Sequence, residues 1–164
     1  MTKVIVPGSF DPITLGHQNI IEQACYLFDE VIIAILNNPN KHSSFFKVEE
    51  RIEIVKQLYE KINKIRVVTF DGALVDLAIL NECKIIIRGL RGLSDLDYEI
   101  QLAQVNNDLS NNKVRTMCLF PDIQYQYLSS SMVKGVNALD KSVEKYVDPI
   151  VYQKILTKRR NINE

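Results

Sequence analysis

The sequence has 164 residues, a length that predicts one compact domain over residues 1–164 with a hydrophobic core of its own. Its 20 Lys and Arg balance 20 Asp and Glu, so no overall charge attracts nucleic acid or an acidic membrane, and both are disfavoured as main partners. With 46% apolar and 24% charged residues, the composition disfavours a disordered chain or a disulfide-stapled miniprotein.

Short runs rich in β-branched residues recur along the chain and are the expected strands. They are residues 4–6, 31–36, 65–70, 85–87 and 115–120, and three of them are apolar almost throughout. An apolar run without alternation is typical of a parallel strand covered on both faces by helices. The sequence therefore predicts an α/β, Rossmann-like fold: an open parallel five-stranded sheet, order 3-2-1-4-5, with helices on both faces.

Apolar stripes at helical spacing predict the helices between these strands. The first stripe is Ile20, Ile21, Ala24 and Leu27, and the second is Ile52, Val55, Leu58, Tyr59 and Ile62. Residues 74–80 and 98–109 predict two more helices. After the last strand the sequence predicts consecutive helices over residues 129–138, 142–147 and 148–159, the last with Asp148 as its N-cap.

Location and redox state follow from what the chain lacks. The longest strongly apolar stretch, residues 31–36, is far shorter than the roughly 20 residues of a membrane span. No cleavable hydrophobic region precedes the first strand, so we expect a cytoplasmic protein. Cys25, Cys83 and Cys118 have no Cys-x-x-Cys spacing, which favours reduced core thiols over disulfides or a zinc site.

The turn after the first strand, residues 7–17, reads PGSFDPITLGH. Its glycines let the backbone approach a ligand closely, and a helix N-terminus offers free N–H groups and positive potential. The expected ligand is a phosphate, with His17 beside it. The alternative is an ordinary tight turn in which His17 is a surface residue.

Arg88 and Arg91 follow the fourth strand in the segment RGLRG. Strands one and four are neighbours in the predicted order, so their loops flank the crevice where such sheets bind ligands, and His17 should face Arg88. Arginine suits bidentate contact with phosphate. A purely structural role would instead require carboxylate partners for both cations.

Two further segments offer weaker candidates for the same site. Ser129, Ser130 and Ser131 cluster hydroxyls and N–H groups at a helix start, where a simple N-cap is the alternative. Lys41 follows the second strand, although lone loop lysines are usually solvated. The C-terminal basic residues 158–160 are explained most simply by the helix dipole.

Several common sites are missing from the sequence. It contains no P-loop motif, no G-x-G-x-x-G, no G-x-S-x-G elbow, and no second His or Cys at zinc-ligand spacing beside His17 or His42. What remains is a site of cations and helix termini without a nucleophile. That combination favours direct phosphoryl or nucleotidyl transfer.

Four segments together closely resemble one enzyme family. They are residues 7–17 with the motif T-x-G-H, RGLR at 88–91, DYE at 97–99 and SSS at 129–131. T-x-G-H alone indicates only the nucleotidylyltransferase superfamily, whose general form is H-x-G-H. The combination is similar to the bacterial phosphopantetheine adenylyltransferases, and the match is collinear over essentially the whole chain.

The resemblance implies transfer of AMP from ATP to 4′-phosphopantetheine, giving dephospho-coenzyme A and pyrophosphate with the help of Mg²⁺. This reaction is the penultimate step of coenzyme A synthesis. Catalysis of this kind brings two phosphates into line and stabilises charge, without a covalent enzyme intermediate. The resemblance also implies a homohexamer and coenzyme A as a feedback ligand.

Residue roles come from the same resemblance. His17 would bind the ATP phosphates and stabilise the transition state, while Lys41 and Arg88 would orient the incoming phosphate. The implied ATP-binding residues are Ser9, Phe10, His17, Gly89, Leu90, Arg91, Glu99, Tyr125, Gln126, Tyr127, Leu128, Ser129, Ser130 and Ser131. The implied acceptor-binding residues are Ser9, Lys41, Leu74 and Arg88, and no protein ligand to a metal is implied.

The chain departs from the family pattern at two of these positions. Ser9 stands where many members have Thr, which keeps the hydroxyl, and Tyr125 stands where many have Trp, which keeps an aromatic ring. Two alternative functions stay open. One is a nucleotidylyltransferase of the same fold that uses nicotinamide mononucleotide or glycerol 3-phosphate as acceptor. The other is a non-catalytic nucleotide-binding regulator.

Overall fold

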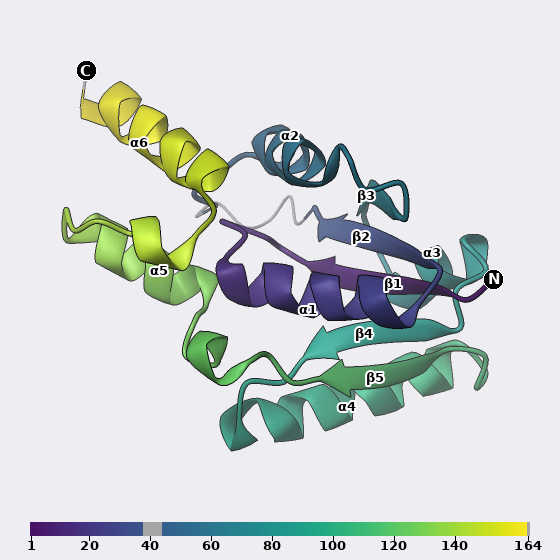
Figure 1. Cartoon of the computed structure of the whole chain (residues 1–164). Coiled ribbons are helices and arrows are strands. Elements are labelled where there is room, and N and C mark those ends of the chain that lie inside the picture. Colours follow the sequence, from purple (N-terminus) through teal and green to yellow (C-terminus); the bar gives the residue numbers. More distant parts are fainter. Residues whose placement is uncertain (38–43, 164) are drawn as a thin grey trace.

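The fold is an α/β sandwich whose central sheet is covered by helices on both faces (Figure 1). The computed structural model describes residues 1–37 and 44–163. The strands are β1 (Lys3–Gly8), β2 (Glu30–Leu36), β3 (Ile65–Phe70), β4 (Ile85–Gly89) and β5 (Arg115–Leu119). The helices are α1 (Leu15–Leu27), α2 (Val48–Tyr59), α3 (Leu74–Leu80), α4 (Leu93–Leu109), α5 (Ser130–Ala138) and α6 (Pro149–Asn163), with 3-10 turns η1 (Ile123–Tyr125) and η2 (Glu144–Tyr146).

The five strands are parallel and lie in the order β3-β2-β1-β4-β5, which confirms the predicted sheet. The central strand β1 is paired very differently on its two sides. It pairs with β2 over all six of its residues, but with β4 only at Val4 and Ile5. The carboxyl ends of β1 and β4 therefore separate, and this opens a crevice at the point where the strand order reverses.

Each face of the sheet has its own core. On one face Val4, Val31 and Ile33 pack against α1, α2, α5 and α6, and on the other Ile5, Ile32 and Ile86 pack against α3. Successive residues of β1 and β2 thus point to opposite cores, as the pleat of a strand requires. Because both faces are covered, the central strands are apolar without alternation.

Three details of the predicted helices are wrong. Leu27 was expected in the α1 stripe but is more than half exposed at the end of the helix, and Ile62 lies beyond the end of α2. Ile54 takes the buried position in α2 instead. Residues 142–147 contain only the single 3-10 turn η2. Val143 and Val147, which flank this turn, are buried.

α4 also differs from its prediction. It begins at Leu93, five residues before the predicted start at residue 98. Its expected apolar stripe is largely uncovered, because Ile100 and Val105 are exposed and Glu99 is the one buried residue of the helix. The apolar pattern of α4 therefore does not serve the core of this chain.

α6 is attached to the body of the fold by a cap, a core contact and ion pairs. Asp148 accepts a hydrogen bond from the Ile150 N–H at 2.8 Å, so the predicted N-cap is confirmed. The basic end of the helix is paired, since Lys158 contacts Glu50 and Arg159 contacts Asp140. Exposed ion pairs of this kind contribute little free energy, so the apolar contact of α6 dominates its attachment.

The three cysteines are free, with Cys83 buried and the other two half-buried. Burial raises the pKa of all three thiols, which keeps them protonated and unreactive at neutral pH. No helix within the described residues is both long and apolar enough to cross a membrane.

Shortening the apolar contact of α6 should destabilise the protein. Ile155 is fully buried in the core beside α2, so Ile155→Ala leaves a cavity and should lower the free energy of unfolding by about 3 kcal/mol. Urea denaturation measures this loss. The matched control is Leu139→Ala at an exposed position, where the free energy should change by less than about 0.5 kcal/mol. Equal effects of the two substitutions would contradict the packing of α6.

Candidate active site

A cavity of about 850 Å³ opens at the carboxyl ends of β1 and β4. Its walls come from the β1–α1 turn, the N-terminus of α1, the β4–α4 turn, the inner side of α4, the start of α3 and the β5–α5 loop. These segments are distant in sequence but meet where the two strands separate. The cavity therefore occupies the position that the predicted sheet order assigns to a ligand.

Most of the predicted site residues line this cavity. They are Ser9, Phe10, His17, Leu74, Arg88, Gly89, Arg91, Glu99, Tyr125, Leu128, Ser129 and Ser130. Four others lie outside the lining: Leu90, Gln126, Tyr127 and Ser131. Leu90 is buried and its N–H donates to the Leu119 carbonyl, while Tyr127 packs edge-on against Tyr146. Lys41 lies outside the described residues.

A Cβ would be crowded at two glycines of the wall. Phe10 turns its buried ring under the β1–α1 turn, and a Cβ on Gly8 would lie 2.9 Å from that ring. A Cβ on Gly16 would lie 3.3 Å from the Tyr125 carbonyl oxygen, so the β5–α5 loop approaches the start of α1 closely. Gly8 and Gly16, the latter in the T-x-G-H motif, thus let the segments of the wall pack closely.

His17 is held as a neutral ring by the start of its own helix. Its Nδ1 accepts a hydrogen bond from the Thr14 N–H at 3.0 Å and lies 2.9 Å from the Thr14 hydroxyl. A ring nitrogen that accepts carries no proton, so the proton resides on Nε2. Burial, followed by the positive charge of Arg91, lowers the pKa of His17 to about 4. At neutral pH the ring is a neutral Nε2–H donor at the cavity wall.

Arg88 is fixed by a carboxylate that the structure buries. Nε and Nη2 donate to the two oxygens of Glu99, both at 2.8 Å, and the Glu99 side chain is only 7% exposed. Burial alone would lower the pKa of Arg88, but the hydrogen bonds and charge of Glu99 outweigh it and hold that pKa above its ordinary value. Nη1 makes no hydrogen bond to a described residue, so the guanidinium keeps donors for a ligand.

Arg91 also has a carboxylate partner. It pairs with Asp95 in the first turn of α4, with contacts of 2.9 and 3.0 Å. Both carboxylates that a structural role would require are therefore present. The four charged residues of the lining cancel, as Arg88 and Arg91 stand against Asp95 and Glu99. The two guanidinium groups of the described wall are thus held in fixed orientations, and the wall carries no net charge.

Two buried polar residues that sequence reasoning missed fasten the β1–α1 turn. Asp11 accepts hydrogen bonds from the Phe45 and Phe46 N–H groups at 2.8 and 2.7 Å. Arg51, which is 5% exposed, donates through Nη1 to the Ser9 carbonyl at 2.7 Å and to the Leu36 carbonyl at 3.1 Å. A signal existed for Arg51, because it is in phase with the buried stripe of α2.

The far end of the cavity is more apolar. Leu36, Phe70 and Leu74 line it from one side, and Leu102 lines it from α4 together with the polar Asn106. Neither Leu102 nor Asn106 was predicted as a site residue, because nothing in the sequence shows which side of α4 faces the sheet. The cavity joins a polar end, suited to phosphates, to an apolar arm with an amide beside it. Within residues 1–37 and 44–163 no three His, Cys, Asp or Glu side chains gather as a metal site.

Comparison with known proteins shows the family. Residues 5–136 match the cytidylyltransferase-like family model. The chain is 42% identical over 158 residues to the phosphopantetheine adenylyltransferase of Geobacter sulfurreducens, covering 96% of this chain and 95% of that protein. It is 41% identical to that of Streptomyces coelicolor, covering 98% and 99%. The chain belongs to the phosphopantetheine adenylyltransferase family.

Solved structures of more distant proteins share the fold of this phosphopantetheine adenylyltransferase family member. A Vibrio parahaemolyticus protein assigned as a nicotinate-nucleotide adenylyltransferase superposes with a TM-score of 0.64 at 15% identity, covering 95% of this chain and 99% of its own. The lipopolysaccharide core biosynthesis protein of Thermoplasma volcanium gives a TM-score of 0.54 at 20% identity, covering 74% and 97%. At these identities the likeness concerns the fold alone.

The lowered pKa of His17 makes stability depend on pH. The unfolded chain titrates near 6.5 and the folded protein near 4, so the unfolded chain binds the proton first as the pH falls. The neutral His17 ring contributes fully to the free energy of unfolding above pH 6.5, and this contribution is lost as the pH falls toward 4. When the pH falls from 7 to 5, the free energy of unfolding of the wild type should decrease by up to about 2 kcal/mol more than that of His17→Asn, as measured by urea unfolding. Identical pH slopes would show that the folded ring titrates normally.

Proposed function

We propose that residues 1–164 form a single catalytic domain that transfers AMP from ATP to 4′-phosphopantetheine, giving dephospho-coenzyme A and pyrophosphate. The observation that carries this proposal is a cavity that joins a phosphate-type end, with His17 and Arg88, to an apolar arm. Relatives over nearly the whole chain carry the name phosphopantetheine adenylyltransferase. The reaction is the penultimate step of coenzyme A synthesis, and we place it in the cytoplasm.

ATP would occupy the polar end between α1 and the β5–α5 loop. The N-termini of α1 and α5 converge there, and Ser129 already caps α5 through the Met132 N–H at 3.0 Å. Ser9, Phe10, Gly89 and Arg91 would border the phosphates, with Tyr125 and Leu128 toward the base. For Leu90, Gln126, Tyr127 and Ser131 a contact with ATP remains a prediction of the family resemblance.

Because the described cavity wall has no net charge, it does not compensate the negative charge of ATP. Helix N-termini supply only partial positive charge, and the described cations are paired with carboxylates. We propose that Mg²⁺ enters with ATP and is held mainly by the phosphates and water, since the described wall offers hydroxyls and no acidic cluster. When bound, the ion would neutralise charge on the phosphates.

Transfer would proceed in one direct step. An oxygen of the acceptor phosphate attacks the α-phosphorus, a P–O bond forms, and the bond to the bridging oxygen breaks as pyrophosphate leaves. Arg88, fixed by Glu99, would orient the acceptor phosphate, and Lys41 would assist it. Glu99 thereby contributes through Arg88, whatever contact it makes with the nucleotide. His17 would donate from Nε2 to the charge that develops on the transferring group.

The apolar arm favours phosphopantetheine over other acceptors. A long, amide-bearing chain would find apolar contacts at Leu74 and Leu102 and a hydrogen-bond partner at Asn106, all of which line the cavity. Nicotinamide mononucleotide would need a surface to stack its ring and hold its ribose, and glycerol 3-phosphate would leave the arm empty. A non-catalytic regulator would bind ATP without turnover.

One assay separates these alternatives. Pyrophosphate release is measured with Mg²⁺-ATP and each acceptor in turn: phosphopantetheine, nicotinamide mononucleotide and glycerol 3-phosphate. We expect release with phosphopantetheine alone. Release with another acceptor would assign a different activity to the same fold, and ATP binding without release would indicate a regulator.

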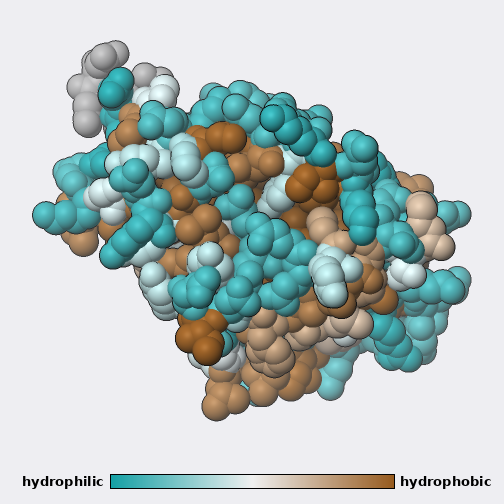
Figure 2. All heavy atoms as spheres, in the orientation of Figure 1, coloured by the Kyte–Doolittle hydropathy of each residue, from teal (hydrophilic) through white to brown (hydrophobic). Residues whose placement is uncertain are grey.

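We also propose that six copies assemble and that coenzyme A binds as a feedback ligand, as the family resemblance implies. Support comes from the uncovered apolar side chains of α4, β5 and the loop after it, which include Leu93, Val105, Leu109, Phe120 and Ile123. Figure 2 shows brown and tan atoms gathered along the lower edge of the molecule, where Figure 1 places these elements. Apolar patches of this kind usually mark an interface. Sedimentation measures the number of copies.

Removing the His17 ring should affect turnover more than ATP binding. His17→Ala deletes one oriented donor to the transition state, so kcat should fall by roughly 100-fold, about 3 kcal/mol. The KM for ATP should change by less than about threefold. Steady-state kinetics at pH 8 measures both, and a normal kcat with a raised KM would assign His17 to ATP binding only.

The acceptor arm can be tested at Leu74. Leu74→Arg places a charged side chain in the apolar arm and should raise the KM for phosphopantetheine at least about tenfold, with the KM for ATP nearly unchanged. The matched control is Leu139→Arg on the exposed end of α5, which should change neither KM. Indifference of the acceptor KM to Leu74→Arg would remove the arm from the acceptor site.

A further inference from the structure

The β5–α5 loop forms one wall of the cavity, yet its own main-chain hydrogen bonds are local. Tyr125 N–H donates to Asp122, and Leu128 N–H donates to Tyr125, at 2.8 and 3.0 Å. Such turns shape the loop but do not fix its distance from α1. That distance matters because the Tyr125 carbonyl lies against Gly16, one residue before His17.

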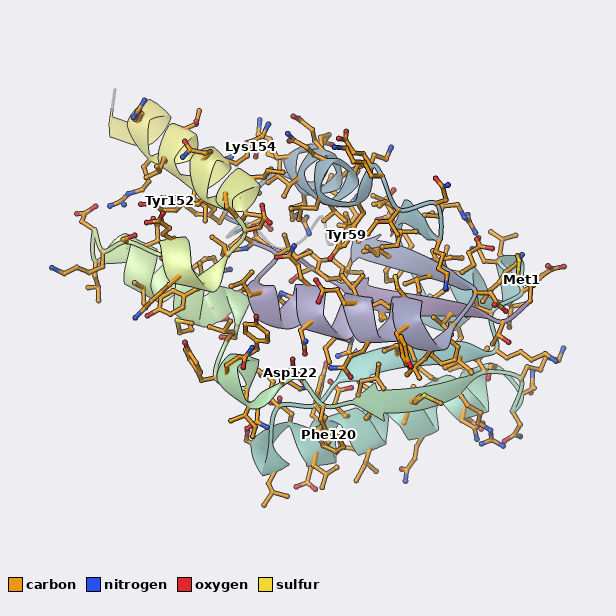
Figure 3. All side chains as sticks on the ribbon, viewed as in Figure 1. Met1, Tyr59, Phe120, Asp122, Tyr152 and Lys154 are labelled. Atoms are coloured by element: carbon orange, nitrogen blue, oxygen red, sulfur yellow. The ribbon has the colours of Figure 1, made fainter. Side chains whose placement is uncertain are left out.

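Side chains of α1 supply the missing connection. Asn19, which is 8% exposed, donates from Nδ2 to the Asp122 carboxylate at 2.9 Å, and its Oδ1 accepts from the Asp122 N–H at 2.9 Å. One turn later Gln23 donates both to Asn19 Oδ1 at 3.0 Å and to the Phe120 carbonyl at 2.9 Å. In Figure 3, Phe120 and Asp122 lie where the chain leaves β5 toward η1.

The far end of the loop is tied to the same segment of chain. The Ser130 hydroxyl donates to the Pro12 carbonyl at 2.8 Å. Between the two ties lie Tyr125, Leu128 and Ser129, all of which line the cavity. The loop is therefore fastened at both ends to the β1–α1 region that carries His17.

α1 itself does not need Asn19 to hold its position. Ile20, Ile21 and Ala24 are buried against the sheet and already dock the helix. Asn is also a poor residue for a helix interior, since its amide competes for main-chain hydrogen bonds. A buried amide here is explained by the contact it makes with the loop.

We propose that Asn19 and Asp122 form a positioning clamp, which sets the distance between His17 and the wall that holds the nucleotide. This inference rests on the proposed function in one respect, that the polar end of the cavity binds ATP. Loss of the clamp weakens ATP binding and leaves the acceptor arm unaffected, because that arm is built from the ends of β2 and β3 and from α3 and α4. Neither Asn19 nor Asp122 lines the cavity, so both act as positioning residues.

The test reverses the pair. Asn19→Asp sets two carboxylates against each other while keeping the size of the side chain. Exchanging both residues, Asn19→Asp with Asp122→Asn, restores a donor opposite an acceptor, and Asp at 19 still accepts from the main-chain N–H of residue 122 and from Gln23. Asp122→Ala removes the exposed carboxylate that accepts from Asn19 and leaves the buried Asn19 amide in place.

Calorimetry with Mg²⁺ and α,β-methylene-ATP measures nucleotide affinity without turnover. Asn19→Asp and Asp122→Ala should raise the Kd about tenfold, as expected for loss of a charge-assisted hydrogen bond, and the exchanged pair should return it to within about threefold of wild type. The KM for phosphopantetheine should stay within about twofold in all three. Thermal unfolding is recorded for every variant.

The control is Asn81→Asp at the end of α3, where the amide accepts from Arg66 and donates to Leu77, away from the cavity. It should leave the Kd unchanged. A lowered melting temperature with unchanged Kd in Asn19→Asp and Asp122→Ala would overturn the clamp as a positioning device, and so would an exchanged pair that recovers stability but not affinity. If the wild type binds the ATP analogue but releases no pyrophosphate from ATP with phosphopantetheine, the proposed reaction fails and the affinities still decide the clamp. If it binds no analogue, both fail.

Discussion

The early end of pairing between β1 and β4 is the constraint on which the rest of this protein depends. Only Val4 and Ile5 of β1 pair with β4, whereas β1 and β2 stay paired to Gly8. The separation leaves space at the carboxyl ends of two neighbouring strands, and His17 at the start of α1 and Arg88 near the end of β4 line it. The segments that line the cavity meet because the sheet opens there.

The cavity wall is ordered before any ligand arrives. Thr14 fixes the tautomer of His17, and Arg51 holds the carbonyl of Ser9 in place. The two carboxylate oxygens of Glu99 accept hydrogen bonds from Arg88 and fix the orientation of its guanidinium. This order has an electrostatic consequence, since the carboxylates that hold the cations also cancel their charge. A polyphosphate would then depend on helix N-termini and on Mg²⁺ for neutralisation, while the cations contribute direction.

Sequence patterns predicted the strands and most of the residues that line the cavity, because strands and the turns after them are encoded locally. The sheet order followed from the order that open α/β sheets of this kind usually have. The strands, the cap of α5 at Ser129 and the turn ending in His17 depend on residues close together in the chain. The predicted burial of α4 was wrong because burial depends on contacts that are not local. Its apolar residues matched a buried helix, yet the structure covers only part of them and turns Glu99, Leu102 and Asn106 toward the cavity.

By itself, the sequence determined the fold class, the family and the segments that reach the site, since periodicity, turn chemistry and the T-x-G-H and RGLR segments are local features. Only the tertiary structure decided that Arg88 pairs with Glu99, that Arg51 and Asp11 fasten the β1–α1 turn, and that Asn19 meets Asp122 across 103 positions of chain. These contacts join residues from different elements. Their partners are chosen by how the helices pack on the sheet, which no short stretch of sequence encodes.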